Sequence, residues 1–142
     1  QGGVHFISLF SKFDPNAKPA QPLTRESLAF LRQQLAKTPA GTPVVVATHL
    51  CFDAITNRDK LIDTFGKANV ILVLGGHYHK ATVHRYRGFH FVHFPSPRDQ
   101  TEVPVLRISP DRLVAIPYDH AKKQWTDNRG KILDGKIRGP GK

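Results

Sequence analysis

Short apolar runs alternate with amphipathic stretches over the first half of the chain. The three most apolar runs are VHFISLF, PVVVAT and NVILVL, at residues 4–10, 43–48 and 69–74. Each has the length of a buried strand, and the three successive valines of the second run favour a strand covered on both faces. We therefore predict three strands in this part of the chain.

Two stretches between these runs have the spacing of a helix. Thr24 is a suitable N-cap, and the leucines that follow it lie on one helical face up to Lys37. Residues 57–67 predict a second, shorter helix. The proline-rich residues 11–22 predict a loop. The resulting order, strand–helix–strand–helix–strand, is typical of right-handed parallel crossovers and of an α/β fold.

The pattern changes after residue 80. Residues 81–86 and 89–94 predict two strands joined by a tight turn, and residues 103–108 and 112–118 predict a second hairpin. The chain thus passes from an α/β part to a β-meander.

We place the folded part of the chain at residues 1–118. Residues 119–142 contain seven basic groups, three acidic groups and four glycines, and this composition predicts a loosely held, polar basic tail. The chain contains no methionine and begins with Gln1, which favours a fragment of a longer protein. No targeting segment is recognisable, so that a cytoplasmic and an exported location both stay open.

Composition narrows the classes of protein further. The formal net charge is +10, and it divides into +3, +3 and +4 over residues 1–50, 51–100 and 101–142. A nucleic-acid binder usually concentrates its basic residues on one face, so this even distribution argues against one, although it would attract anionic substrates. The single cysteine, Cys51, cannot form a disulfide framework, and its apolar neighbours predict that it is buried. No apolar run is long enough for a membrane span.

Three histidines follow predicted strands. His49 comes directly after PVVVAT, and His77 and His79 follow NVILVL in a turn that begins with Gly75 and Gly76. Ligand sites of open α/β sheets form beyond the carboxyl ends of the strands, so these side chains should lie close together. Imidazole nitrogens suit Zn, Fe and related metals. The other histidines are interpreted as structural: His5, His84, His90, His93 and His120.

The segments VVVATHL and NVILVLGGHYHKA resemble the C-terminal half of the calcineurin-like metallophosphoesterases. The order of predicted elements agrees with that family over residues 3–118. The resemblance implies the C-terminal half of a four-layer α/β/β/α sandwich. It also implies a dinuclear site with two divalent or trivalent ions (Mn, Fe or Zn), in which His49 and His77 bind the second ion and His79 binds the first.

The sequence also departs from that family. It has no Asp-x-His, no Gly-Asp and no Gly-Asn-His, the motifs that supply the bridging carboxylate, an Asn ligand and the proton-donating histidine. Three histidines alone cannot hold two ions at the spacing of about 3.5–4 Å typical of two-metal sites. We therefore expect about half of the site here, no catalytic residue beyond the metal ligands, and a partner that is the missing N-terminal half.

The resemblance implies that the complete protein is a metal-dependent phosphoester hydrolase and that this chain alone is inactive. Tyr78, between the two histidines of the motif, and Arg98 are candidates for contact with a phosphate-ester substrate, although packing is the favoured role of Tyr78. Arg85 and Arg87 are weaker candidates, because exposed arginines near hairpins are usually ordinary surface charges.

Two other functions stay open. The first is a catalytically inactive metal-binding or interaction module that keeps the same fold. The second is a basic nucleic-acid-binding domain, which the even spread of charge makes the weakest of the three.

Overall fold

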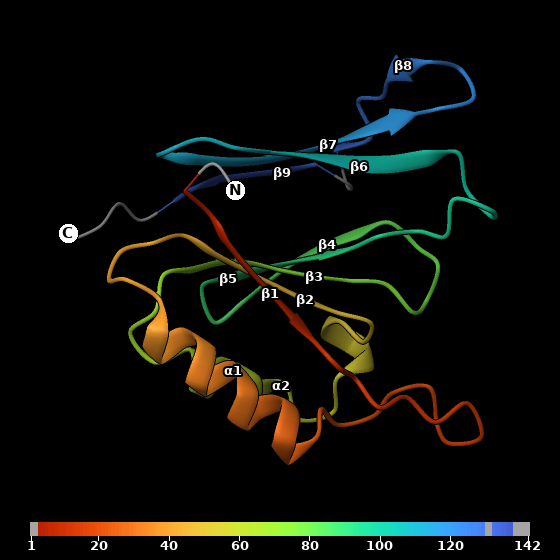
Figure 1. Ribbon diagram of the computed structural model, residues 1–142. Helices are drawn as coiled ribbons and strands as arrows, with labels where there is room; N and C mark the ends of the chain where they lie inside the picture. Colours follow the sequence, from red (N-terminus) through yellow and green to blue (C-terminus); the bar gives the residue numbers. More distant parts are fainter. Residues whose placement is uncertain (1–2, 130–131, 138–142) are drawn as a thin grey trace.

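The fold has three layers in the computed structural model, which describes residues 3–129 and 132–137 (Figure 1). Two helices cover one face of a five-stranded sheet, and a second sheet covers the other face. The strands are β1 (His5–Leu9), β2 (Val44–Thr48), β3 (Val70–Gly75), β4 (Thr82–Tyr86), β5 (Phe89–His93), β6 (Glu102–Ile108), β7 (Arg112–Asp119), β8 (Gln124–Trp125) and β9 (Leu133–Lys136), and the helices are α1 (Arg25–Lys37), α2 (Arg58–Phe65) and the short 3-10 helix η1 (Phe52–Ala54).

The first sheet has the order β1-β2-β3-β5-β4. The strands β1, β2, β3 and β5 are parallel, and β4 runs antiparallel to β5. The predicted crossovers through α1 and α2 are therefore confirmed. Thr24 caps α1, since its hydroxyl accepts a hydrogen bond from the backbone N–H of Ser27.

The first predicted hairpin has a different role from the one expected. Its second strand, β5, lies between β4 and β3, with Val73 opposite Phe91 and Gly75 opposite His93. The hairpin thus extends the parallel sheet and is not part of a separate meander. The reason is that Phe91 and Val92 point to opposite faces of the sheet and both are buried, so β5 needs cover on both faces.

The second sheet differs from the sequence prediction at its C-terminal end. The β6–β7 hairpin forms as predicted, but β8 and β9 both pair with β7. Leu133 and Ile137 are buried in the core between the sheets. In the described part of residues 119–142, β8 and β9 are therefore paired with the second sheet. These two strands do not form the loosely held tail that the composition predicts. Residues 130–131 and 138–142 of the predicted tail lie outside the described residues.

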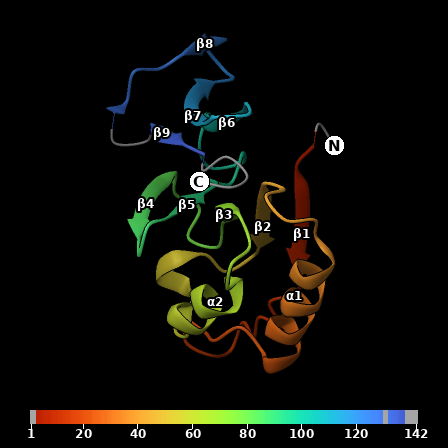
Figure 2. The same ribbon diagram turned by 90° about the vertical axis from the view of Figure 1, so that its left-hand side faces the viewer.

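The core has two parts, one on each face of the first sheet. Figure 2 shows the two helices on one side of the first sheet and the second sheet on the other side. Leu31 of α1, Phe65 of α2 and Val46 of β2 belong to the helix side, and Val45 and Leu113 belong to the space between the sheets. Adjacent valines of β2 are thus buried on opposite faces, as the run of valines predicts. Cys51 is buried on the helix side, and burial raises the pKa of its thiol to about 12.

Two apolar surfaces remain uncovered. The strand β1 is at an edge of its sheet, and Phe6 and the following Phe10 are 53% and 76% exposed. On the second sheet, Val105 lies opposite Ile116, and both are exposed together with Trp125. In the described part of the chain, no helix is long and apolar enough to cross a membrane.

Candidate metal site

The carboxyl ends of β2 and β3 meet at one edge of the first sheet. They line a cleft of about 560 Å³ whose wall includes His49, His77 and His79 together with residues 94–96. The topology therefore brings all three predicted ligands to one cleft, because parallel neighbouring strands end at the same edge.

Gly75 permits the close approach of these two strand ends. A Cβ at this position would overlap Cβ of Cys51 and would lie 2.6 Å from the carbonyl oxygen of Thr48. Backbone hydrogen bonds continue from this contact, since the N–H of Gly76 donates to the carbonyl oxygen of His49 (3.1 Å). The turn that carries His77 is thus fixed directly against the segment that carries His49.

His49 and His77 form the centre of the site. Nδ1 of His77 lies 3.2 Å from Nε2 of His49, and the two rings are nearly perpendicular, with an interplanar angle of 83°. The ring of Phe13 meets both imidazoles edge-on, at 5.6 Å from His49 and 4.7 Å from His77. Burial, and then the neighbouring His49, lower the pKa of His77. A neutral imidazole is the form that binds a metal ion.

His79 turns toward a different partner. Its Nδ1 lies 2.7 Å from Oδ2 of Asp99, and Gln100 donates from Nε2 to the carbonyl oxygen of His79 (2.7 Å). Asp99 also accepts a hydrogen bond from Nε of Arg98 (2.8 Å). The hydrogen bonds from Arg98 and then from His79 lower the pKa of Asp99 to about 2.

Asp99 is a site residue that the sequence reasoning did not identify. It belongs to no recognisable motif. One feature of the sequence could have pointed to it. Asp99 is the only acidic residue between Asp63 and Glu102, and His77 and His79 lie in the same stretch.

Ser11, in the loop after β1, connects the edge strand to the site. Its hydroxyl shares a hydrogen bond with the hydroxyl of Thr48 (2.7 Å) and accepts one from the backbone N–H of His49 (3.1 Å). The position of His49 therefore depends on β1 as well as on β2.

The candidate substrate residues are distributed over both ends of the sheet. Tyr78 packs against the helix-side core, with its ring 4.9 Å from that of His77. Arg98 is at the histidine edge, where its side chain is 81% exposed. Arg85 and Arg87 are on the β4–β5 hairpin, whose turn lies at the opposite end of the parallel strands.

The two central nitrogens fit a single metal ion. Two ligands at about 2.0–2.1 Å from a tetrahedral ion are about 3.3 Å apart, close to the observed 3.2 Å. His79 fits a ligand as well, since a carboxylate on Nδ1 fixes the tautomer and leaves Nε2 available. Nowhere within residues 3–129 and 132–137 do three His, Cys, Asp or Glu side chains converge as a complete metal-binding group. The donor set is therefore suitable but incomplete.

Comparison with solved structures establishes the fold. The chain matches GAP50 of Plasmodium, described as the anchor in the inner membrane complex, with a TM-score of 0.66 and 15% sequence identity. The match covers 98% of this chain and 50% of GAP50, so this chain spans about half the length of that protein. No family model and no curated protein matches the sequence.

Structures of Vps29 from Entamoeba histolytica, a protein with the calcineurin-like metallophosphoesterase fold, also match. The Zn²⁺ complex matches at 12% identity with a TM-score of 0.40, over 94% of this chain and 99% of Vps29. A single-mutant form matches at 12% identity with a TM-score of 0.37, over 93% and 97%.

The contact at Gly75 gives a prediction about the site. Gly75→Ala should destabilise the fold by about 1–3 kcal/mol, because the added methyl overlaps Cys51 and the Thr48 carbonyl. We expect a melting temperature lower by roughly 3–10 °C in a thermal denaturation followed by circular dichroism.

Gly76→Ala is the matched control, since its Cβ would meet only the Phe94 carbonyl oxygen at an ordinary 3.5 Å. Equal melting temperatures for the two variants would show that the strand ends do not approach each other as described.

Proposed function

We propose that this chain supplies the histidine ligands of a metal-dependent phosphoester hydrolase whose remaining ligands lie outside residues 1–142. The observation that carries the proposal is the 3.2 Å separation of Nε2 of His49 and Nδ1 of His77 at the carboxyl edge of a parallel sheet. That spacing and those donors suit one ion of Zn, Fe or Mn.

Each histidine has a distinct part in the proposed site. His49 and His77 hold one ion through the two facing nitrogens. His79 binds the other ion through Nε2, while Asp99 fixes its ring through Nδ1. When bound, the two ions supply a deprotonated water at neutral pH and neutralise charge on the phosphoryl oxygens. Arg98, exposed beside Asp99, is the candidate for contact with a phosphate ester, and Tyr78 supports the histidine turn by packing.

The proposed site needs negatively charged ligands that the three histidines do not provide. Three neutral imidazoles do not offset the charge of two metal ions, and Asp99 is already bound to Arg98 and His79. In this proposal the carboxylates that balance the ions would come from an N-terminal half outside residues 1–142. The uncovered edge of β1 and the apolar outer face of the second sheet are the surfaces on which that half packs.

Metal binding gives the first test of this proposal. His49→Ala and His77→Ala should each weaken Zn²⁺ binding by more than the roughly 10–100-fold that loss of an outer-shell partner costs. Affinity is measured by competition with a chromogenic chelator. His120→Ala, a histidine in the exposed turn after β7, is the control. Unchanged Zn²⁺ affinity in both site variants would exclude these residues as ligands.

Asp99 gives a second, independent prediction. Asp99→Asn should weaken Zn²⁺ binding by about 10–100-fold, because the amide no longer holds the His79 ring as a carboxylate does. Asp111→Asn, in the β6–β7 turn, is the matched control. If both Asn variants bind Zn²⁺ as the unmodified chain does, Asp99 has no part in positioning His79.

Hydrolysis gives the decisive measurement. With p-nitrophenyl phosphate and added Mn²⁺ or Zn²⁺, residues 1–142 alone should be inactive, and a longer protein that includes the N-terminal half should be active. His77→Ala in that longer protein should abolish the activity. Full turnover by residues 1–142 alone would contradict the division of the site between two halves.

A second candidate is a non-catalytic interaction module of the same fold. It is favoured by the likeness to GAP50, which is described as an anchor, and by the exposed apolar residues on β1 and on the second sheet. A longer protein that binds metal through His49 and His77 yet hydrolyses no phosphoester would decide for this candidate.

A further inference from the structure

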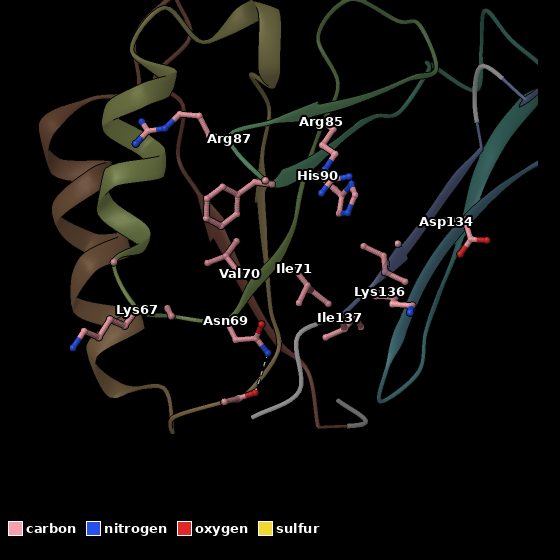
Figure 3. Close-up of a pocket in the computed structure, with 17 residues that line it drawn as sticks. Lys67, Asn69, Val70, Ile71, Arg85, Arg87, His90, Asp134, Lys136 and Ile137 are labelled. Atoms are coloured by element: carbon pink, nitrogen blue, oxygen red, sulfur yellow. Dashed lines mark hydrogen bonds between the residues drawn. The ribbon is translucent and has the colours of Figure 1, made fainter. Parts of the chain in front are cut away.

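A second cavity lies at the other end of the molecule from the histidine site. It has a volume of about 700 Å³ and is bordered by the starts of β3 and β5 and by β9 (Figure 3). Apolar side chains from both sheets, Ile71, Leu113 and Ile137, form part of its wall. Arg85 and His90 bring polar groups to the same space from β4 and β5.

The charges around this cavity do not cancel. Arg87 is engaged by Asp59 and Asp63 at 3.3 and 3.0 Å, and Asp134 is engaged by Arg112 at 2.6 Å. No carboxylate of the described residues lies within 4 Å of the guanidinium of Arg85. Lys67 and Lys136 at the margins add further positive charge. The cavity is therefore electropositive after its internal ion pairs are taken into account.

His90 supplies an unpaired polar atom beside Arg85. The two residues lie directly opposite each other in the β4–β5 ladder, and the close-up view shows the two side chains adjacent. Nδ1 of His90 is buried and has no hydrogen-bond partner among the described residues. Buried polar atoms without a partner are uncommon in native proteins, and each of them calls for an explanation. Burial, and then Arg85, lower the pKa of His90, so this imidazole is neutral near pH 7.

Gly135 of β9 keeps this arrangement open. A Cβ on Gly135 would lie 2.7 Å from Nε2 of His90. A side chain there would overlap the imidazole unless the ring moved. The absence of a side chain at this position thus lets the His90 ring lie directly against β9.

We propose that this cavity binds a small phosphate monoester, a function separate from the histidine site. The guanidinium of Arg85 pairs with the phosphate oxygens, since its planar fork matches their geometry. The His90 ring lies beside this guanidinium and so senses a phosphate bound to it. Ile71, Leu113 and Ile137 face the organic part of the ligand.

The test uses the 142-residue chain with labelled histidine side chains, observed by NMR. Phenyl phosphate, inorganic phosphate and benzoate are titrated separately at constant ionic strength. We expect a saturable shift of the His90 ring signals with phenyl phosphate, weaker binding of inorganic phosphate because it lacks the apolar group, and weaker binding of benzoate because it carries a single charge.

Variants locate the binding. Arg85→Gln should weaken phenyl phosphate binding about tenfold or more, the effect of losing a charged hydrogen-bonding partner. Arg107→Gln, on β6 in the second sheet, is the matched control and should leave the affinity unchanged. The proposal is overturned if the His90 signals do not move, if both arginine variants lose affinity equally, or if only the His49 and His77 signals respond. Equal affinity for all three anions would also overturn it.

Discussion

The candidate site depends on one steric condition, the absence of a side chain at Gly75. The strand ends of β2 and β3 approach until Cys51 and the Thr48 carbonyl occupy the volume that a methyl group would need. The backbone of Gly76 can then bond to His49, and His77 is brought to within hydrogen-bond distance of the His49 ring. The geometry of the imidazole pair is thus a consequence of backbone packing, to which the Ser11 hydroxyl adds a third point of attachment.

The three histidines are held by two different kinds of interaction. His49 and His77 lie against each other and against Phe13, and partial burial lowers the pKa of His77, which favours its neutral form. His79 is held by Asp99, whose charge is in turn stabilised by Arg98. On one side of the cleft, the facing nitrogens of His49 and His77 can both donate a lone pair to a metal ion. On the other side, Asp99 fixes the orientation and the tautomer of the His79 ring.

Much of the fold could be predicted from the sequence, because the spacing of apolar residues indicates which segments form helices and strands. The valines of β2 predicted burial on both faces, and the position of His49 and His77 after parallel strands predicted their proximity. The position of β5 beside β3 could not be predicted, because a hairpin pattern does not show which neighbour its second strand pairs with. The strand β9 was concealed because Asp134, Gly135 and Lys136 separate Leu133 from Ile137. Asp99 acts through tertiary contact alone, which no spacing in the sequence expresses.

The parallel pairing of β1 with β2 also has a kinetic consequence. His5 lies opposite Val44, and Val44 opposite Val70, so each pairing closes a long segment of chain that includes a helix. The second sheet begins instead with a local hairpin between β6 and β7. Non-local pairings form slowly, because the entropy of loop closure is lost before the contacts are gained. The edge that carries the histidines is thus assembled from the slowest contacts of the fold, and its apolar strands stay exposed to aggregation for longer than those of the hairpin.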